Sequence, residues 1–246
     1  MSAWCKVMGG GDWPIYFERG NLTSRFGRFC IQPLHRGFAK TLIAPMQKAL
    51  LETLPGPAVS GARVCLKSAI HNESARESLI SSQLVTALSE LRLTSAACFP
   101  LLGKARLSRP RALHIDDLQF SAPVQILAPP RTLPQLQAAE SLELDFLVHW
   151  GRGSIPMNAA SDIELPRGWL RLARRHSPVV QANLHCSLIE FGPLAGGEQL
   201  ILEITTDGSL APGDALRRAS QHVKRARGTM ISSTALPHSI LQTATR

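Results

Sequence analysis

The hydrophobic residues of this chain recur at helical spacing in three stretches. Residues 41–54 and 78–93 each place apolar side chains three or four positions apart on one face, with mostly polar residues opposite. Residues 212–227 repeat the pattern and open on Pro212, a residue favoured in the first turn of a helix. We therefore predict three amphipathic helices, the first of which must kink or begin at Pro45.

Alternation of apolar and polar residues, which is typical of half-buried strands, marks other parts of the chain. Strands are expected over residues 25–32, 62–67, 113–120, 124–127, 142–149 and 198–206. The remainder of 94–140 is rich in proline, so we expect irregular structure there. Residues 1–24 contain a run of three glycines and should form a loose lead-in, while the Ser- and Thr-rich residues 231–246 should form a frayed tail.

Composition limits the class of protein without choosing one. The chain has 246 residues, of which 44% are hydrophobic and 18% are charged, so it has material for a sizeable core. Its formal net charge of +9 favours polyanionic surroundings such as nucleic acid or a nucleoprotein complex. The basic residues lie in scattered groups, however, and solvated faces or helix ends explain those groups equally well.

Residue types that can perform catalysis or bind metals are present, but they are scattered along the chain. The five cysteines include no CxxC pair, and none of the eight histidines shares a metal-ligand spacing with Cys, Asp or Glu. Asp116 and Asp117 are neighbours on an expected strand and would point to opposite faces, which makes a poor metal cage. We therefore expect no catalytic residue and no cofactor in this chain, buried or idle thiols, and a reducing compartment.

No membrane contact is expected either. No apolar run approaches the ~20 residues of a membrane span, and the start of the chain lacks both a secretory core and an Arg/Ser-rich transit segment.

Two long segments resemble a known protein family. Residues 33–56, PLHRGFAKTLIAPMQKALLETLPG, resemble the strand-to-helix signature of the alpha subunits of bacterial-type DNA-directed RNA polymerases. Residues 202–216, LEITTDGSLAPGDAL, are similar to a second signature of that family, and Gly151-Arg152-Gly153 and residues 177–183 resemble shorter motifs between them. Trp4-Cys5-Lys6 at the start and Gly27-Arg28-Phe29 before the first signature look more like the plastid-encoded members than the bacterial ones, which implies a plastid (chloroplast) location.

The resemblance implies an α+β fold of two subdomains. A dimerisation subdomain, consisting of a sheet plus two helices, would span residues 25–60 and 170–230, and a β-rich insert subdomain would span residues 61–169. In the family the two helices pair with their copies in a second alpha chain, so that the protein forms a homodimer. Their apolar stripes would then supply the dimer contact: Leu42, Met46, Leu50, Leu216, Ala219 and Val223.

The resemblance also implies that the dimer nucleates the polymerase, with one copy contacting the beta subunit and the other contacting beta-prime. The chain would then be a non-catalytic subunit of a nucleotidyltransferase. By motif position, the large-subunit contacts fall on Gln47 and Lys48 and on Val180 and Gln181, where the family carries arginine pairs. Lys48 keeps a charge without the planar fork of arginine, and the second pair carries none.

Other departures from the family's motifs suggest a fast-diverging copy of the subunit, or a gene translation that differs from the mature protein. Ala211 stands where the family has a capping threonine, whose loss costs ~1 kcal/mol. If the transcript belongs to a land-plant plastid, editing could convert Pro45 into Leu or Ser, which sequencing the cDNA would test.

Few residues follow the last helix, so we expect the family's carboxy-terminal DNA-contacting domain to be absent, and DNA to be reached only through the holoenzyme.

Two alternatives stay open. The first is a basic organellar RNA-binding or ribosomal-type protein, although only 5% of residues are aromatic and no basic and aromatic residues interleave as stacking platforms require. The second is a decayed alpha paralogue that no longer assembles.

Overall fold

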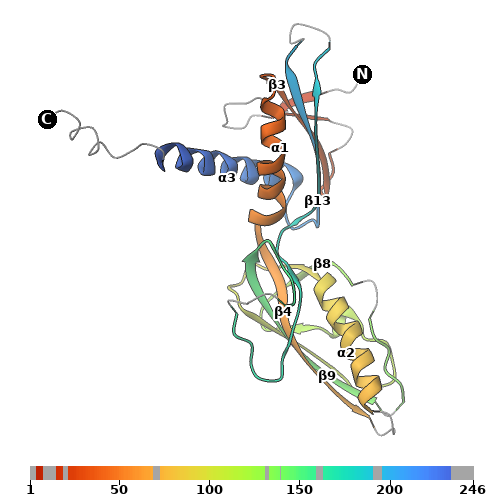
Figure 1. Ribbon diagram of the computed structural model, residues 1–246. Helices are drawn as coiled ribbons and strands as arrows, with labels where there is room; N and C mark the ends of the chain where they lie inside the picture. The colour runs from red at the N-terminus through yellow and green to blue at the C-terminus, as the bar shows by residue number, and fades with distance from the viewer. Residues whose placement is uncertain are drawn as a thin grey trace, which may run out of the picture.

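The computed structural model describes residues 4–7, 15–18, 22–68, 73–130, 133–138, 140–158, 163–190 and 196–233. The described chain forms two lobes, each built on a five-stranded sheet with helices against it (Figure 1). This arrangement confirms the predicted α+β class. Within the described parts, no helix combines the length and the apolar content that a membrane span needs.

The sheet of the first lobe has the strand order β1-β2-β3-β14-β13. Its strands are β1 (Trp4–Val7), β2 (Ile15–Glu18), β3 (Phe26–Leu34), β13 (Val179–Leu188) and β14 (Glu198–Thr206), and neighbours pair antiparallel. Two of these strands lie in the segment predicted to be a loose lead-in, which is therefore partly regular. β13 was not predicted as a strand, because a register shift between Val179 and Gln181 interrupts its alternation.

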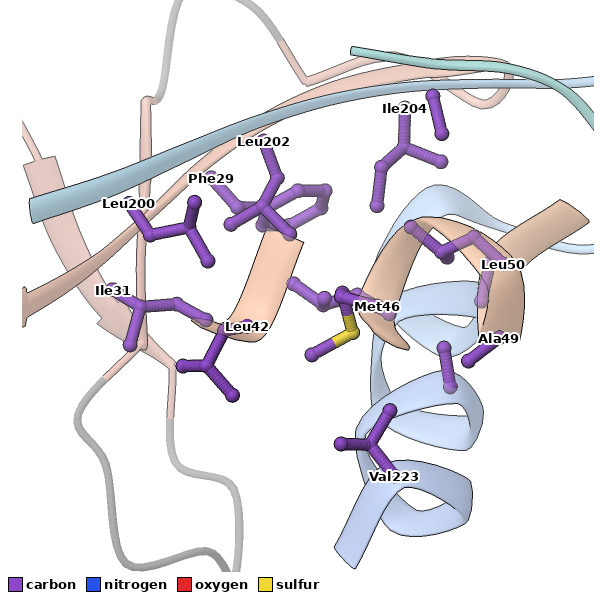
Figure 2. Close-up of a cluster of buried hydrophobic side chains, with 14 of the residues drawn as sticks. Phe29, Ile31, Leu42, Met46, Ala49, Leu50, Leu200, Leu202, Ile204 and Val223 are labelled. Carbon is purple, nitrogen blue, oxygen red and sulfur yellow. The ribbon is translucent and has the colours of Figure 1, made fainter. Parts of the chain in front are cut away.

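Helices cover one face of this sheet. They are α1 (Phe38–Lys48), which continues directly into a π-helical turn, η2 (Ala49–Thr53), and α3 (Pro212–Ser233). Their apolar stripes meet the inward-facing residues of β3 and β14, and Figure 2 shows Met46 between the sheet and Val223 of α3. Each large apolar side chain buried here contributes roughly 1.5–3 kcal/mol, so this contact holds the lobe together.

The first helix is fixed at its start by a carboxylate from the sheet. Gly37 adopts a left-handed conformation with φ 80° just before the helix, which leaves its N-H and that of Ala39 without intrahelical partners. Glu198, the first residue of β14, accepts hydrogen bonds from both, at 2.7 and 3.0 Å. The bond from Gly37 is the main reason that the pKa of Glu198 is lowered, and burial opposes it.

Pro45 lies inside α1 rather than at its start. A proline in a helix interior cannot donate to the carbonyl four residues earlier and crowds the preceding turn. Its ring is exposed, so it provides no core packing in return. The alternative that the helix begins at Pro45 is therefore excluded.

The sheet of the second lobe has the order β11-β4-β9-β6-β7. Its strands are β4 (Pro55–Ser68), β6 (Leu101–Leu107), β7 (Gln119–Phe120), β9 (Glu140–Arg152) and β11 (Leu170–Arg171). Smaller elements are β5 (Arg92–Thr94), paired with β8 (Gln125–Ala128), β10 (Ser154–Ile155), paired with β12 (Arg174–Arg175), and a 3-10 turn, η3 (Ile115–Asp117). The helix α2 (Glu73–Glu90) packs on this sheet.

The expectation of irregular structure in 94–140 is wrong for β6, which pairs with β9 along its whole length. Its inward-facing positions include Gly103 and Ala105, so the alternation of hydrophobicity is weak. Gly103 is required because a Cβ there would run into the ring of Phe146 on β9. Likewise, residues 113–120 form the 3-10 turn and only the two strand residues of β7.

Two separate cores divide the chain. The first takes buried residues up to Leu54 and again from Val179, and the second takes them from Val59 to Leu172. The strand β4 therefore crosses the predicted boundary between residues 60 and 61, and the return to the first lobe falls a few residues after 169. The predicted tail lies mostly outside the described residues, although α3 continues to Ser233.

Replacing Pro45 with alanine should raise the free energy of unfolding by about 1–3 kcal/mol, because the helix regains a hydrogen bond and loses a steric conflict. Urea unfolding followed by circular dichroism measures the change. Gln47→Ala, an equally exposed position on the same helix, is the control and should change stability by less than about 0.5 kcal/mol. A P45A protein no more stable than Q47A would contradict this account.

Glu198→Gln should destabilise the protein at pH 7 and much less in acid. A carboxylate whose pKa is lowered in the folded state stabilises that state above its unfolded pKa, and this stabilisation is lost as the pH falls through the folded pKa. Thermal melting at pH 7 and below the glutamate range tests this. The difference between the wild type and E198Q should shrink in acid, and a constant difference would disprove the cap.

Candidate interaction surfaces

The six side chains predicted to contact a second copy all lie in the chain's own core. Leu42, Met46 and Leu50 on α1 and η2, and Leu216, Ala219 and Val223 on α3, are each no more than 5% exposed. They pack the helices on one another and on the sheet. A second copy could reach only the exposed faces of these helices. A dimer contact would therefore have to use the exposed neighbours of these six residues. That two copies associate stays a prediction.

The exposed faces of the two helices differ in character. On α1 the exposed residues are Lys40, Thr41, Ala44, Pro45, Gln47 and Lys48. On α3, as far as residue 226, they are Gly213, Arg217, Arg218, Gln221, His222, Lys224, Arg225 and Ala226. The second half of α3 projects away from the body of the lobe (Figure 1). This helix therefore presents a basic surface that the sheet of its own chain does not cover.

The four residues predicted to contact the large subunits are all exposed. Gln47 and Lys48 lie at the end of α1, and Val180 and Gln181 lie at the start of β13. The hydroxyl of Ser177 donates to the carbonyl of Leu50 at 2.9 Å, which ties the two segments together. The structure thus joins two regions that are far apart in the sequence, although their role in binding stays a prediction.

The junction between the lobes is built around a buried histidine. His176 is 3% exposed and lies between Gly56 of β4 and Gly151 of β9. A Cβ on Gly151 would come within 2.7 Å of its imidazole ring, and a Cβ on Gly56 would overlap its carbonyl oxygen. The backbone N-H of His176 donates to Gly153 at 2.9 Å, and its Nδ1 lies 3.0 Å from the carbonyl oxygen of Gly56.

Basic side chains lie near this histidine. Burial lowers the pKa of His176, Arg174 and His149 lower it further, and the hydrogen bond to Gly56 opposes them. Burial also lowers the pKa of His149, whose Nδ1 lies 2.6 Å from the hydroxyl of Ser60. Both imidazoles are therefore held neutral at pH 7, and the junction is stabilised by packing and by hydrogen bonds to the backbone.

The residues considered for catalysis or metal binding have structural surroundings. Asp117 forms an ion pair with Arg111 at 2.6 Å and caps the 3-10 turn, while Asp116 is exposed. Among the described residues, no three His, Cys, Asp or Glu side chains converge as metal ligands would. The thiol of Cys30 is buried, which raises its pKa to about 11, whereas Cys65 and Cys98 are free and exposed. Of the two alternatives expected, buried or idle thiols, burial therefore does not apply to Cys65 and Cys98.

A cavity of about 10 Å³ lies under α2 and is lined by apolar side chains. Ligand pockets usually have several hundred Å³, so this space does not suit a small-molecule ligand.

A comparison with protein families matches residues 32–226 to the RNA polymerase Rpb3/Rpb11 dimerisation domain. The match runs from the end of β3 through α1 and both sheets into α3, so it includes both helices of the first lobe. The chain belongs to this family. The alpha-subunit resemblance carried by residues 33–56 and 202–216 is thereby confirmed.

Several curated bacterial proteins resemble the chain. A DNA-directed RNA polymerase subunit alpha of Synechococcus elongatus is 27% identical over 201 residues, covering 80% of this chain and 63% of the relative. The protein of that name from Pelobacter propionicus is 26% identical, covering 85% and 62%, and the one from Moorella thermoacetica is 25% identical, covering 83% and 65%. The chain thus spans less than two thirds of the length of these relatives.

We call the space between Gly56 and Gly151 that holds His176 the histidine slot. The sequence did not predict it. The motif Gly151-Arg152-Gly153 was noticed as a resemblance, but nothing in it indicates a partner at His176 or at Gly56. His176 is one of eight scattered histidines in the sequence, and in the structure it is a hydrogen-bonded structural residue. The one available signal was the pair of glycines at the end of a strongly alternating strand, where a close approach of backbone is common.

Gly151→Ala should lower the free energy of unfolding by about 1–3 kcal/mol, because its methyl group would overlap the ring of His176 in a packed junction. Gly213→Ala on α3 is the matched control, since a Cβ there meets nothing within 4 Å. It should leave stability unchanged or raise it by less than about 1 kcal/mol. Equal stability of the two variants in urea unfolding would show that the junction tolerates movement of His176.

Proposed function

We propose that this protein is the alpha subunit of a bacterial-type DNA-directed RNA polymerase of the plastid kind. In this proposal two copies associate and nucleate the assembly of the beta and beta-prime subunits for transcription. The chain supplies no catalytic residue to the nucleotidyltransferase reaction. The observation that carries the proposal is the family match from residue 32 to residue 226, which includes both helices whose exposed faces are available to a second copy.

The plastid assignment rests on the resemblance of Trp4-Cys5-Lys6 and Gly27-Arg28-Phe29 to plastid-encoded alpha subunits. The contacts with the large subunits are proposed at the exposed Gln47 and Lys48 and at the exposed Val180 and Gln181. Because the family carries arginines at these positions, the contacts of this chain would depend less on charge pairing, with Lys48 as the remaining cation.

Subunit composition tests the proposal directly. An affinity-tagged copy, expressed in the source plastid and purified at moderate salt, should retain beta and beta-prime in stoichiometric amounts. Recovery of ribosomal proteins without either large subunit would refute the proposal in favour of the ribosomal alternative. Recovery of the tagged chain alone would support a copy that no longer assembles.

Lys48→Glu should lower the retention of a large subunit about three- to tenfold, because a charge reversal at a contact weakens both encounter and binding. Lys104→Glu, the same change at an exposed position on β6 in the second lobe, is the control and should retain both large subunits. Quantitative mass spectrometry of the purified complexes measures both. Equal retention in the two variants would remove Lys48 from the contact.

A further inference from the structure

The sheet of the first lobe ends in an open strand. Among the strands that the structure describes, β13 pairs only with β14, and its other side is the edge of the sheet. Among the described residues, positions 180–188 form no backbone hydrogen bond beyond that pairing. An edge of this kind presents a row of N-H and C=O groups on which another extended chain can pair.

The sequence of this edge lacks the usual protection against such pairing. Edge strands are commonly blunted by lysine, other inward-pointing charges or proline. Residues 179–188 read VVQANLHCSL and contain no Lys, Arg, Asp, Glu or Pro. Exposed apolar residues lie at both ends of the strand, Val180 at 41% and Leu188 at 50% exposure. The strand therefore favours contact with another chain over contact with water alone.

The hydrophobic core is incomplete along the same edge. On β14 the inward-facing Leu200, Leu202 and Ile204 are fully buried. Their cross-strand neighbours Cys186 and Leu184 on β13 are only partly covered, although they belong to the same apolar face. The apolar layer between the sheet and α1 thus continues to β13, and among the described residues no further strand lies beside it (Figure 1).

We propose that β13 accepts an extended segment of a different protein as a sixth strand of this sheet. The segment would carry apolar residues at alternate positions, which would cover Leu184, Cys186 and Leu188, and it would pair through its backbone. This inference rests on the proposed function, which assigns the helical faces to a second copy and places the large subunits at Val180 and Gln181. A large subunit is therefore the source of the strand.

A second copy of this chain is a poorer occupant of the edge. The dimer contact through the helices uses the same surface on both copies. A chain with a second self-complementary surface at β13 would join dimers into a tetramer or, where the two symmetry axes do not close, into an open filament. An assembly that stays at two copies of the chain therefore requires that the edge bind a partner other than the chain itself.

The test uses the double variant Val180→Lys/Leu188→Lys, which adds charge at two exposed positions and spares the core. Leu79→Lys is the matched control, because Leu79 is 48% exposed on α2 of the other lobe. Each tagged chain is co-expressed with beta and beta-prime, and the retained large subunits are quantified. The double variant should retain at least about tenfold less of one large subunit, because burying a lysine amine against an apolar strand is unfavourable. L79K should retain normal amounts.

Thermal melting and light scattering of the isolated variants separate the outcomes. If the melting temperature of the double variant is well below that of the wild type, L188K alone is used, since Leu188 lies far from the start of β13. Normal retention in a folded variant overturns the edge proposal and removes Val180 from the large-subunit contact, but it leaves the proposed role in polymerase assembly intact. Loss of both large subunits by the wild type contradicts the proposed function itself. Loss of self-association in the variant shows that the edge binds a second copy and overturns the choice of partner.

Hydrogen exchange distinguishes strand addition from a contact of side chains only. The amides of residues 180–188 that point away from β14 should exchange at least about tenfold more slowly in the complex than in the isolated chain, because added backbone hydrogen bonds protect them. Unchanged exchange across β13 in a complex that retains both large subunits would overturn the proposal.

Discussion

The first lobe depends on the packing of two helical stripes against one face of a single sheet. Leu42, Met46 and Leu50 reach down from α1 and η2, and Val223 approaches from α3. Because one chain completes this contact by itself, the lobe has its own core before any partner arrives. The helices are thereby held in fixed positions, and their outer faces, not their apolar stripes, are what a second copy would meet.

Three constraints at the ends of α1 and η2 fix that packing. Glu198 binds the first backbone amides, the π-helical turn ends the helical segment at Thr53, and Ser177 binds the carbonyl of Leu50. The same short region leads into β4 and receives the chain again after His176. The orientation of the second lobe is therefore set by residues next to the helix end, and the slot formed by Gly56 and Gly151 leaves His176 little freedom to shift.

Periodicity in the sequence was sufficient for the helices and for strands with clear alternation, such as β9 and β14. It did not reveal where the stripes face: the spacing of Leu42, Met46 and Leu50 is the same for a helix on its own sheet and for a helix on a partner. β6 and β13 escaped prediction because Gly103 and Ala105 weaken the first pattern and a bulge breaks the second. The histidine slot depends on residues 120 positions apart, His176 and Gly56, and no local pattern contains such a contact.

The central claim is that two copies of this chain associate through the exposed faces of α1 and α3. Light scattering of the purified chain, with its mass of 26.7 kDa, measures this directly. The purified chain should have twice that mass at micromolar concentration, and the variant Ala44→Arg, changed on the exposed face of α1, should have the mass of a single chain. A wild-type protein that stays at the mass of one chain would contradict the account.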